Sequence, residues 1–179
     1  MHEPDLPDPH APIEDMSELT YYEQRVEAIQ ALLIEKGMIS ADDVRRAVED
    51  MDARSPAIGA KVIARAWVDP DFKEHLLRDA KAAIATLDVN VDTWSTLVAI
   101  ENTETTHNVV VCTLCSCYPR SLLGLPPDWY KSLNFRARVV QEPRTVLKEF
   151  GLELTPDIQV RVYDSTADMR YLVIPQRPA

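Results

Sequence analysis

The three cysteines of this chain lie close together, at Cys112, Cys115 and Cys117. A thiolate is both a nucleophile and a soft metal ligand. Three sulfurs at this spacing converge on one point if the backbone folds back on itself. The Cys-Ser-Cys step also brings the amide nitrogens of Ser116 and Cys117 toward that point, where deprotonated nitrogens would be strong ligands. The run therefore predicts a claw around one metal ion.

Five such ligands, three sulfurs and two nitrogens, leave one position of a six-coordinate ion open to a substrate or water. Strong anionic donors favour a low-spin trivalent ion and suit Zn²⁺ poorly, because zinc prefers four tetrahedral ligands. Two other interpretations stay open. Cys112 and Cys115 could form a redox pair, or half of a zinc site with His107 as a further ligand. Neither explains Cys117, and His107 is better explained as a structural loop histidine.

The segments around the cysteines predict an α+β fold. An acidic arm with several prolines covers residues 1–17, a helical lobe covers 18–90, and an α/β lobe covers 91–179 and carries the claw at the end of a strand. Apolar, β-rich stretches predict strands at 94–100, 108–111, 158–162 and 171–174. Short helices are expected at 129–138 and 143–150.

Four helices are expected in the N-terminal lobe. The first covers 18–36 and ends at Gly37, and Ser40 with Asp43 forms a capping box for the second. Ser55-Pro56 and Asp69-Pro70 begin the third and fourth, with the polar residue capping the free amides and proline in the first turn. The fourth is expected to run to Leu87, and its apolar stripe to lie in the core.

Composition excludes several classes of partner. The formal net charge is −10 and the pI is about 4.8, so neither nucleic acid nor an anionic membrane is expected as a partner. No apolar run has the length of a membrane span, and no signal peptide is visible. Clustered cysteines in odd number, without an export signal, favour a cytoplasmic metal or redox site over a disulfide framework.

The claw and its flanks resemble one family closely. The run Val-Cys-Thr-Leu-Cys-Ser-Cys-Tyr-Pro at 111–119 is similar to the metal claw of the cobalt-type nitrile hydratase alpha subunit. The gamma subunit of thiocyanate hydrolase shares this claw. The resemblance covers roughly residues 20–179 and includes these further segments: 101–103, 107–109, 123–131, 161–165, 170–173 and 175–179.

The resemblance implies a chemistry for the site. In the family the middle cysteine is a sulfinate and the third a sulfenate, which correspond to Cys115 and Cys117 here. These two are then the catalytic residues, and Cys112, Cys115, Ser116 and Cys117 the ligands of one Co³⁺ per chain. Thr113 stands where cobalt-type members carry threonine and iron-type members carry serine.

The resemblance also implies partners. A beta-type subunit, in one chain or split into two, is expected to bond to the oxidised sulfurs through arginines. A cobalt-loading activator is expected as well. The chain stops at Ala179, where the family continues with a further helix and strand.

One departure from the family bears on the substrate. Arg120 occupies a position where nitrile hydratases usually carry a tryptophan that lines the substrate pocket, whereas the thiocyanate hydrolase gamma subunit carries arginine. Arg120 is therefore a candidate substrate-binding residue for an anion or a polar nitrile. Three functions follow: hydration of a nitrile to the amide, hydrolysis of thiocyanate to carbonyl sulfide and ammonia, or carriage of cobalt to another complex.

Overall fold

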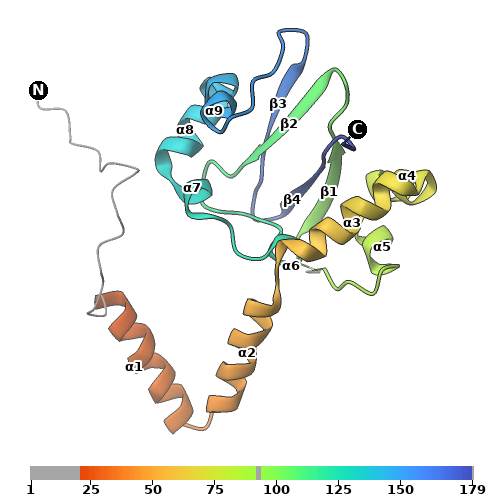
Figure 1. The fold of residues 1–179 in the computed structure, drawn as a ribbon. Coiled ribbons are helices and arrows are strands. Elements are labelled where there is room, and N and C mark those ends of the chain that lie inside the picture. Colours follow the sequence, from red (N-terminus) through yellow and green to blue (C-terminus); the bar gives the residue numbers. More distant parts are fainter. Residues whose placement is uncertain (1–20, 92–93, 179) are drawn as a thin grey trace, which may run out of the picture. The chain divides into compact units, whose positions relative to one another are not determined.

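The computed structural model describes residues 21–91 and 94–178, in two compact units, Met1–Asp52 and Ala53–Ala179 (Figure 1). The arm expected at 1–17 lies outside the described residues. Helices and two small sheets carry a cysteine-rich loop, which confirms the α+β class. The lobe boundary expected near residue 90 stays a prediction.

The first unit holds helix α1 (Tyr21–Glu35) and most of helix α2 (Ala41–Ala53). Gly37, with a φ of 65°, follows α1 as predicted. The capping box is also confirmed: the Asp43 amide donates to Ser40 Oγ at 3.1 Å, and the Ser40 amide donates to the Asp43 carboxylate at 2.9 Å. Neither helix has a buried side chain among the described residues.

The second unit begins with helices α3 (Pro56–Val68), α4 (Pro70–Arg78) and α5 (Ala80–Ala85). Asp69 caps α4 as predicted, since its carboxylate accepts from the Phe72 amide at 3.0 Å. The same expectation was wrong for Ser55, which makes no side-chain capping bond among the described residues.

A single fourth helix from residue 70 to Leu87 was also a wrong prediction. The backbone turns out of the helix at Asp79, which has extended φ and ψ angles. Its carboxylate accepts from the Ala82 amide at 3.1 Å and so caps a new helix, α5. An aspartate that competes for backbone amides in this way interrupts a helix that the apolar pattern alone would continue.

The four strands found in the described residues form two parallel pairs. Strand β1 (Thr96–Glu101) pairs with β4 (Met169–Ile174), and β2 (Thr106–Val111) pairs with β3 (Gln159–Asp164) (Figure 1). Parallel strands need a long crossover, and the helices between β2 and β3 supply it. The register sets Val111 beside Asp164, so both strands end at one edge.

Four short helices make up this crossover: α6 (Arg120–Leu123), α7 (Asp128–Lys131), α8 (Leu133–Gln141) and α9 (Pro143–Glu149). The helix expected at 129–138 is in fact two, because the Ser132 hydroxyl accepts from the Phe135 amide and starts α8. Helix α9 has its predicted place and is followed by Gly151, with a φ of 84°.

Two apolar clusters support the strands. The larger joins α3–α5 to β1 and β4, and the predicted stripe lies in it: Phe72, Leu76, Ala80, Ala83 and Ile84 are buried, with Leu87 packed against them. The smaller joins β2 to α8 and α9 through Val111, Val139 and Val146.

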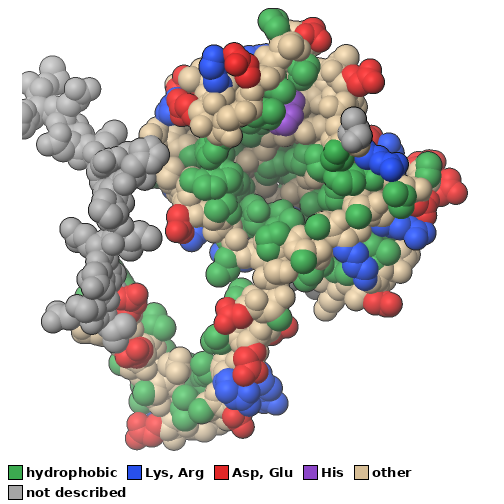
Figure 2. All heavy atoms as spheres, in the orientation of Figure 1, with side chains coloured by type: hydrophobic (Ala, Val, Ile, Leu, Met, Phe, Trp, Pro, Cys, Tyr) green, Lys and Arg blue, Asp and Glu red, His purple; other side chains and the backbone are tan. Residues whose placement is uncertain are grey.

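Apolar side chains also gather in a hollow of the second unit's surface (Figure 2). Two adjoining pockets, of about 370 and 320 Å³, share Val110 and Trp129. No helix among residues 21–91 and 94–178 is long and apolar enough to span a membrane.

Candidate metal centre

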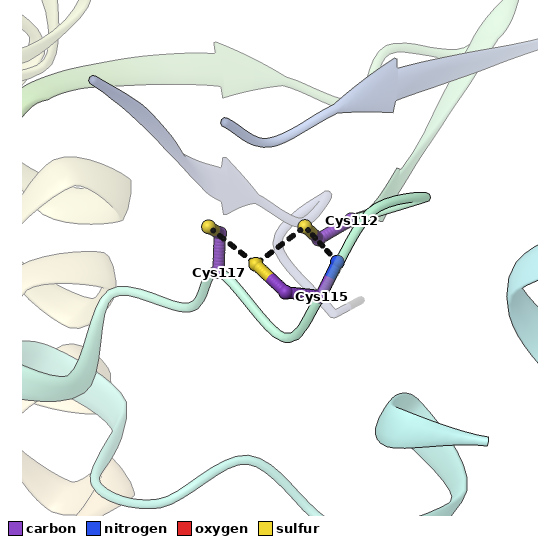
Figure 3. A group of neighbouring side chains, drawn as sticks. All are labelled: Cys112, Cys115 and Cys117. Carbon is purple, nitrogen blue, oxygen red and sulfur yellow. Dashed lines mark hydrogen bonds between the residues drawn. The ribbon is translucent and has the colours of Figure 1, made fainter. Parts of the chain in front are cut away.

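The cysteine loop begins where β2 ends, and the three sulfurs meet above that strand end (Figure 3). Cys115 Sγ lies 3.4 Å from Cys112 Sγ and 3.2 Å from Cys117 Sγ. Cys112 and Cys117 are buried, whereas Cys115 is exposed. All three sulfurs lie within 4.8 Å of one another, so the structure brings the predicted cysteines together.

The spacing of the sulfurs discriminates between kinds of metal geometry. Around an ion with sulfurs at about 2.3 Å, two sulfurs at a right angle lie about 3.3 Å apart, and two at the tetrahedral angle about 3.8 Å apart. The observed separations of 3.4 and 3.2 Å match the right angle. These two pairs of sulfurs therefore fit right-angle coordination better than the tetrahedral angle that zinc prefers.

Backbone amides also point into the cluster. The Cys115 amide donates to Cys112 Sγ at 3.2 Å. Burial alone would raise the pKa of Cys112, but the backbone N–H groups of Cys117, Cys115 and Leu114 outweigh it and lower that pKa. The Cys117 amide is one of these groups, and its role as a metal ligand stays a prediction. Ser116 is half-buried in the loop, and its role as an amide ligand stays a prediction.

The surroundings of the third thiol, Cys117, change its pKa in the opposite direction. Burial, and then the neighbouring Cys115 and Cys112 sulfurs, raise the pKa of Cys117 to about 12, although the Arg170 guanidinium acts against this rise. Of these two thiols, Cys112 is therefore the more readily deprotonated. A bound cation must displace the remaining protons, as metals do at thiol sites.

Strand β3 anchors the beginning of the loop. The Asp164 carboxylate accepts from the Thr113 amide at 2.9 Å and from Thr113 Oγ at 2.6 Å. One residue on, the Ser165 amide donates to the Val111 carbonyl at 2.6 Å. Sequence reasoning gave neither Asp164 nor Ser165 a role. The signal was present, because the end of a strand parallel to β2 must lie at the edge that carries the cysteines.

Helix α7 anchors the end of the loop. The Tyr130 hydroxyl donates to the Cys117 carbonyl at 3.0 Å, and its ring packs edge-to-face on Tyr118 at 5.2 Å. Tyr130 is 3% exposed. Its role was also missed, because nothing in the sequence spacing relates α7 to the cysteines.

Two other predicted residues have definite places. Arg120 is the exposed first residue of α6, three positions after Cys117, and its role in substrate binding stays a prediction. His107 lies in strand β2, so its assignment to a loop was wrong. Its ring contacts the Asn102 amide at 3.3 Å, and it is not among the residues whose ligand atoms cluster with the cysteines in the described part of the chain.

The chain matches known proteins over most of its length. The family model for the nitrile hydratase alpha chain matches residues 20–179. The low-molecular-weight cobalt-containing nitrile hydratase alpha subunit of Rhodococcus rhodochrous is 52% identical, over 87% of this chain and 75% of that protein. The gamma subunit of thiocyanate hydrolase from Thiobacillus thioparus is 40% identical, over 93% and 72%.

Solved structures have the same fold. A double mutant of the iron-type nitrile hydratase from Comamonas testosteroni Ni1 is 44% identical and superposes with a TM-score of 0.82, covering 88% of this chain and 77% of that chain. A recombinant thiocyanate hydrolase with partially modified cobalt centres is 40% identical and superposes with a TM-score of 0.83, covering 90% of this chain and 79% of that chain. With its three sulfurs converging at the end of β2, the chain belongs to the nitrile hydratase alpha-chain family.

Proposed function

We propose that this chain is the alpha subunit of a cobalt-dependent nitrile hydratase, which hydrates a nitrile to the amide. The observation that carries the proposal is the convergence of Cys112, Cys115 and Cys117 with sulfurs 3.2 and 3.4 Å apart, spaced for right-angle coordination. Membership of the family and its cobalt-containing relatives support it.

The cobalt ligands in this proposal are the three sulfurs and the amide nitrogens of Ser116 and Cys117, with one Co³⁺ per chain. When bound, such an ion acts as a Lewis acid that polarises a nitrile or activates water at its open position. Cobalt is favoured over iron by Thr113 and by relatives at 46–52% identity that are named as cobalt-containing. Iron-type structures are 43–44% identical to this chain, so metal analysis decides between cobalt and iron.

The chain's own groups have separate tasks in the reaction. Cys115 as sulfinate and Cys117 as sulfenate would bring oxygens to the reacting groups, and both would donate less charge to a bound metal than thiolates do. The sulfenate oxygen of Cys117 is the candidate nucleophile or base. The buried Tyr130 and the anchored Thr113 hold the loop in place while this chemistry occurs.

The working form in this proposal is a cytoplasmic hetero-oligomer. A beta-type subunit, in one chain or two, would cover the exposed side of the cluster, where Cys115 lies open. Arginines of that subunit would pair with the oxidised sulfurs through charge-assisted hydrogen bonds. An activator that loads cobalt is proposed from the family alone.

A second candidate is hydrolysis of thiocyanate, and Arg120 favours it. An exposed guanidinium directly after the cysteine loop suits an anionic substrate better than a small neutral nitrile. The 40% identity to a thiocyanate hydrolase gamma subunit keeps this function open. A large, polar nitrile would fit the same arginine.

The test is to purify the chain with its co-expressed beta-type partners from cells grown with cobalt. Metal analysis and intact mass should show one cobalt and three added oxygens per chain. Amide formation from a panel of nitriles, and carbonyl sulfide and ammonia from thiocyanate, then separate the two reactions. Cys112→Ser, which replaces one ligand, should lose both cobalt and activity.

Two results would contradict the proposal. Stoichiometric iron would refute cobalt as the metal. Cobalt that is bound reversibly, with no turnover of any substrate, would favour the third hypothesis, a carrier of the metal.

A further inference from the structure

Two buried side chains with hydroxyl groups lie close to the cysteine loop, and they come from segments far apart in the chain. Tyr130 lies in α7 and is 3% exposed, and Ser165 follows β3 and is 1% exposed. The Tyr130 hydroxyl donates to the Cys117 carbonyl at 3.0 Å. The Ser165 amide is held by the Val111 carbonyl, which fixes the serine under the same loop.

Tyr130 is the donor in this hydrogen bond, because the Cys117 carbonyl oxygen can only accept. Burial raises its pKa far above the ordinary value of 10, and the negative charge of Cys112 adds to the rise. The Tyr130 oxygen can still accept a hydrogen bond, as any hydroxyl can.

Ser165 is the group placed to supply that bond. Its Oγ is buried and has no hydrogen-bond partner among the described residues. It lies near enough to the phenol to act against the rise in the pKa of Tyr130. A buried hydroxyl without a partner costs about 1–3 kcal/mol, so a hydrogen bond from Ser165 to the Tyr130 oxygen would be stabilising.

The two ends of the cysteine loop are held differently. Asp164 holds the beginning through Thr113. Tyr130 holds the end through its hydrogen bond to the Cys117 carbonyl and the packing of its ring on Tyr118. A flexible end would leave the third sulfur without a fixed position.

We propose that Tyr130, with Ser165 behind it, is a positioning residue that fixes the Cys117 peptide and thereby the third sulfur of the cluster. The link to metal binding rests on the proposed function, in which Cys117 is a ligand. The placement of Cys117 by Tyr130 does not depend on the proposed function. It can be measured in the metal-free chain.

The test compares Tyr130→Phe with the parent in the full hetero-oligomer. Phenylalanine keeps the ring and its packing and removes the donor alone. Loss of one neutral hydrogen bond corresponds to about a three- to tenfold change in an equilibrium or rate. Cobalt should pass to an external chelator about that much faster, and the sulfur-to-metal absorption bands should shift.

Tyr118→Phe is the matched control. It makes the same chemical change one residue after Cys117, at a hydroxyl for which the described structure has no hydrogen bond. Its release rate and spectrum should equal those of the parent. Ser165→Ala should reproduce part of the Tyr130→Phe effect, and the two changes together should be less than additive.

A measurement without metal separates this proposal from the proposed function. In the metal-free chain, labelling of Cys117 by a maleimide, measured by peptide mass spectrometry relative to Cys115, should rise at least threefold in Tyr130→Phe. Should the parent hydrate no nitrile, this ratio still decides the role of Tyr130. An unchanged ratio, or lower thermal stability with an unchanged spectrum and chelation rate, overturns the proposal. If Ser165→Ala leaves the chelation rate, the spectrum and the labelling ratio unchanged, the role assigned to Ser165 is wrong.

Discussion

The bond between Thr113 and Asp164 gives the sharpest test of how the fold presents the cysteines. Asp164→Ala removes both hydrogen bonds that tie the beginning of the loop to the end of β3, at 2.9 and 2.6 Å. Thr113→Val is the partial change, because valine has the shape of threonine and loses only the shorter bond.

The size of the effect follows from the charge and exposure of the pair. Hydrogen bonds to a charged group contribute about 1.5–3 kcal/mol each, but both residues are exposed and water replaces part of what is lost. We expect Asp164→Ala to cost about 1.5 kcal/mol, which lowers Tm by about 3–6 °C for a domain of this size. Thr113→Val should cost about half as much.

Thermal unfolding of the metal-free chain, followed by circular dichroism, measures the effect. Asp168→Ala is the matched control, since that exposed carboxylate lies four residues further on and makes no side-chain hydrogen bond among the described residues. The double variant of Thr113 and Asp164 should lose less than the sum of the single losses.

Equal Tm values for Asp164→Ala and Asp168→Ala would refute the reasoning. Fully additive losses in the double variant would also count against it, because they would mean that Thr113 and Asp164 do not act through each other.

Three further outcomes are expected. Gly124→Ala should lower the free energy of unfolding in urea by more than ~1 kcal/mol, because φ is 70° and a Cβ would lie 2.6 Å from the Arg54 carbonyl oxygen. An unchanged urea midpoint would contradict this. The ion pair with Arg138 lowers the pKa of Glu149 below 4.5, so the stabilisation by this pair is present above that pH and is lost on further acidification. Glu149→Gln should therefore flatten the fall in Tm between pH 6 and 3. An identical fall in the variant and the parent would exclude this role. Arg120→Trp should raise kcat/KM for small aliphatic nitriles over thiocyanate by roughly 10- to 100-fold, unless Arg120 points away from the site and the ratio stays constant.

The sequence alone was enough to predict the cysteine cluster, because the cluster depends on neighbours along the chain. Cys112, Cys115 and Cys117 converge through local backbone turns, and no distant segment is needed to bring their sulfurs within reach of one another. The helix boundaries that depend on local caps were predictable for the same reason: Ser40 with Asp43, and Asp69, bond to amides three residues away.

Local patterns failed where two local signals compete. The apolar stripe of 70–87 continues through Asp79, and periodicity predicts one helix; the aspartate side chain nevertheless captures the Ala82 amide and divides it. The same competition at Ser132 divides the stretch predicted at 129–138.

Only the tertiary structure decided what holds the cysteines in place. Asp164 lies 51 residues after Thr113, and Tyr130 lies 13 residues after Cys117 in a helix of its own. The parallel pairing of β2 with β3 sets Val111 beside Asp164, and a one-residue shift of that register would move the carboxylate to the other face. Strand register and helix packing depend on the whole core at once, so the spacing of residues along the chain does not encode them locally.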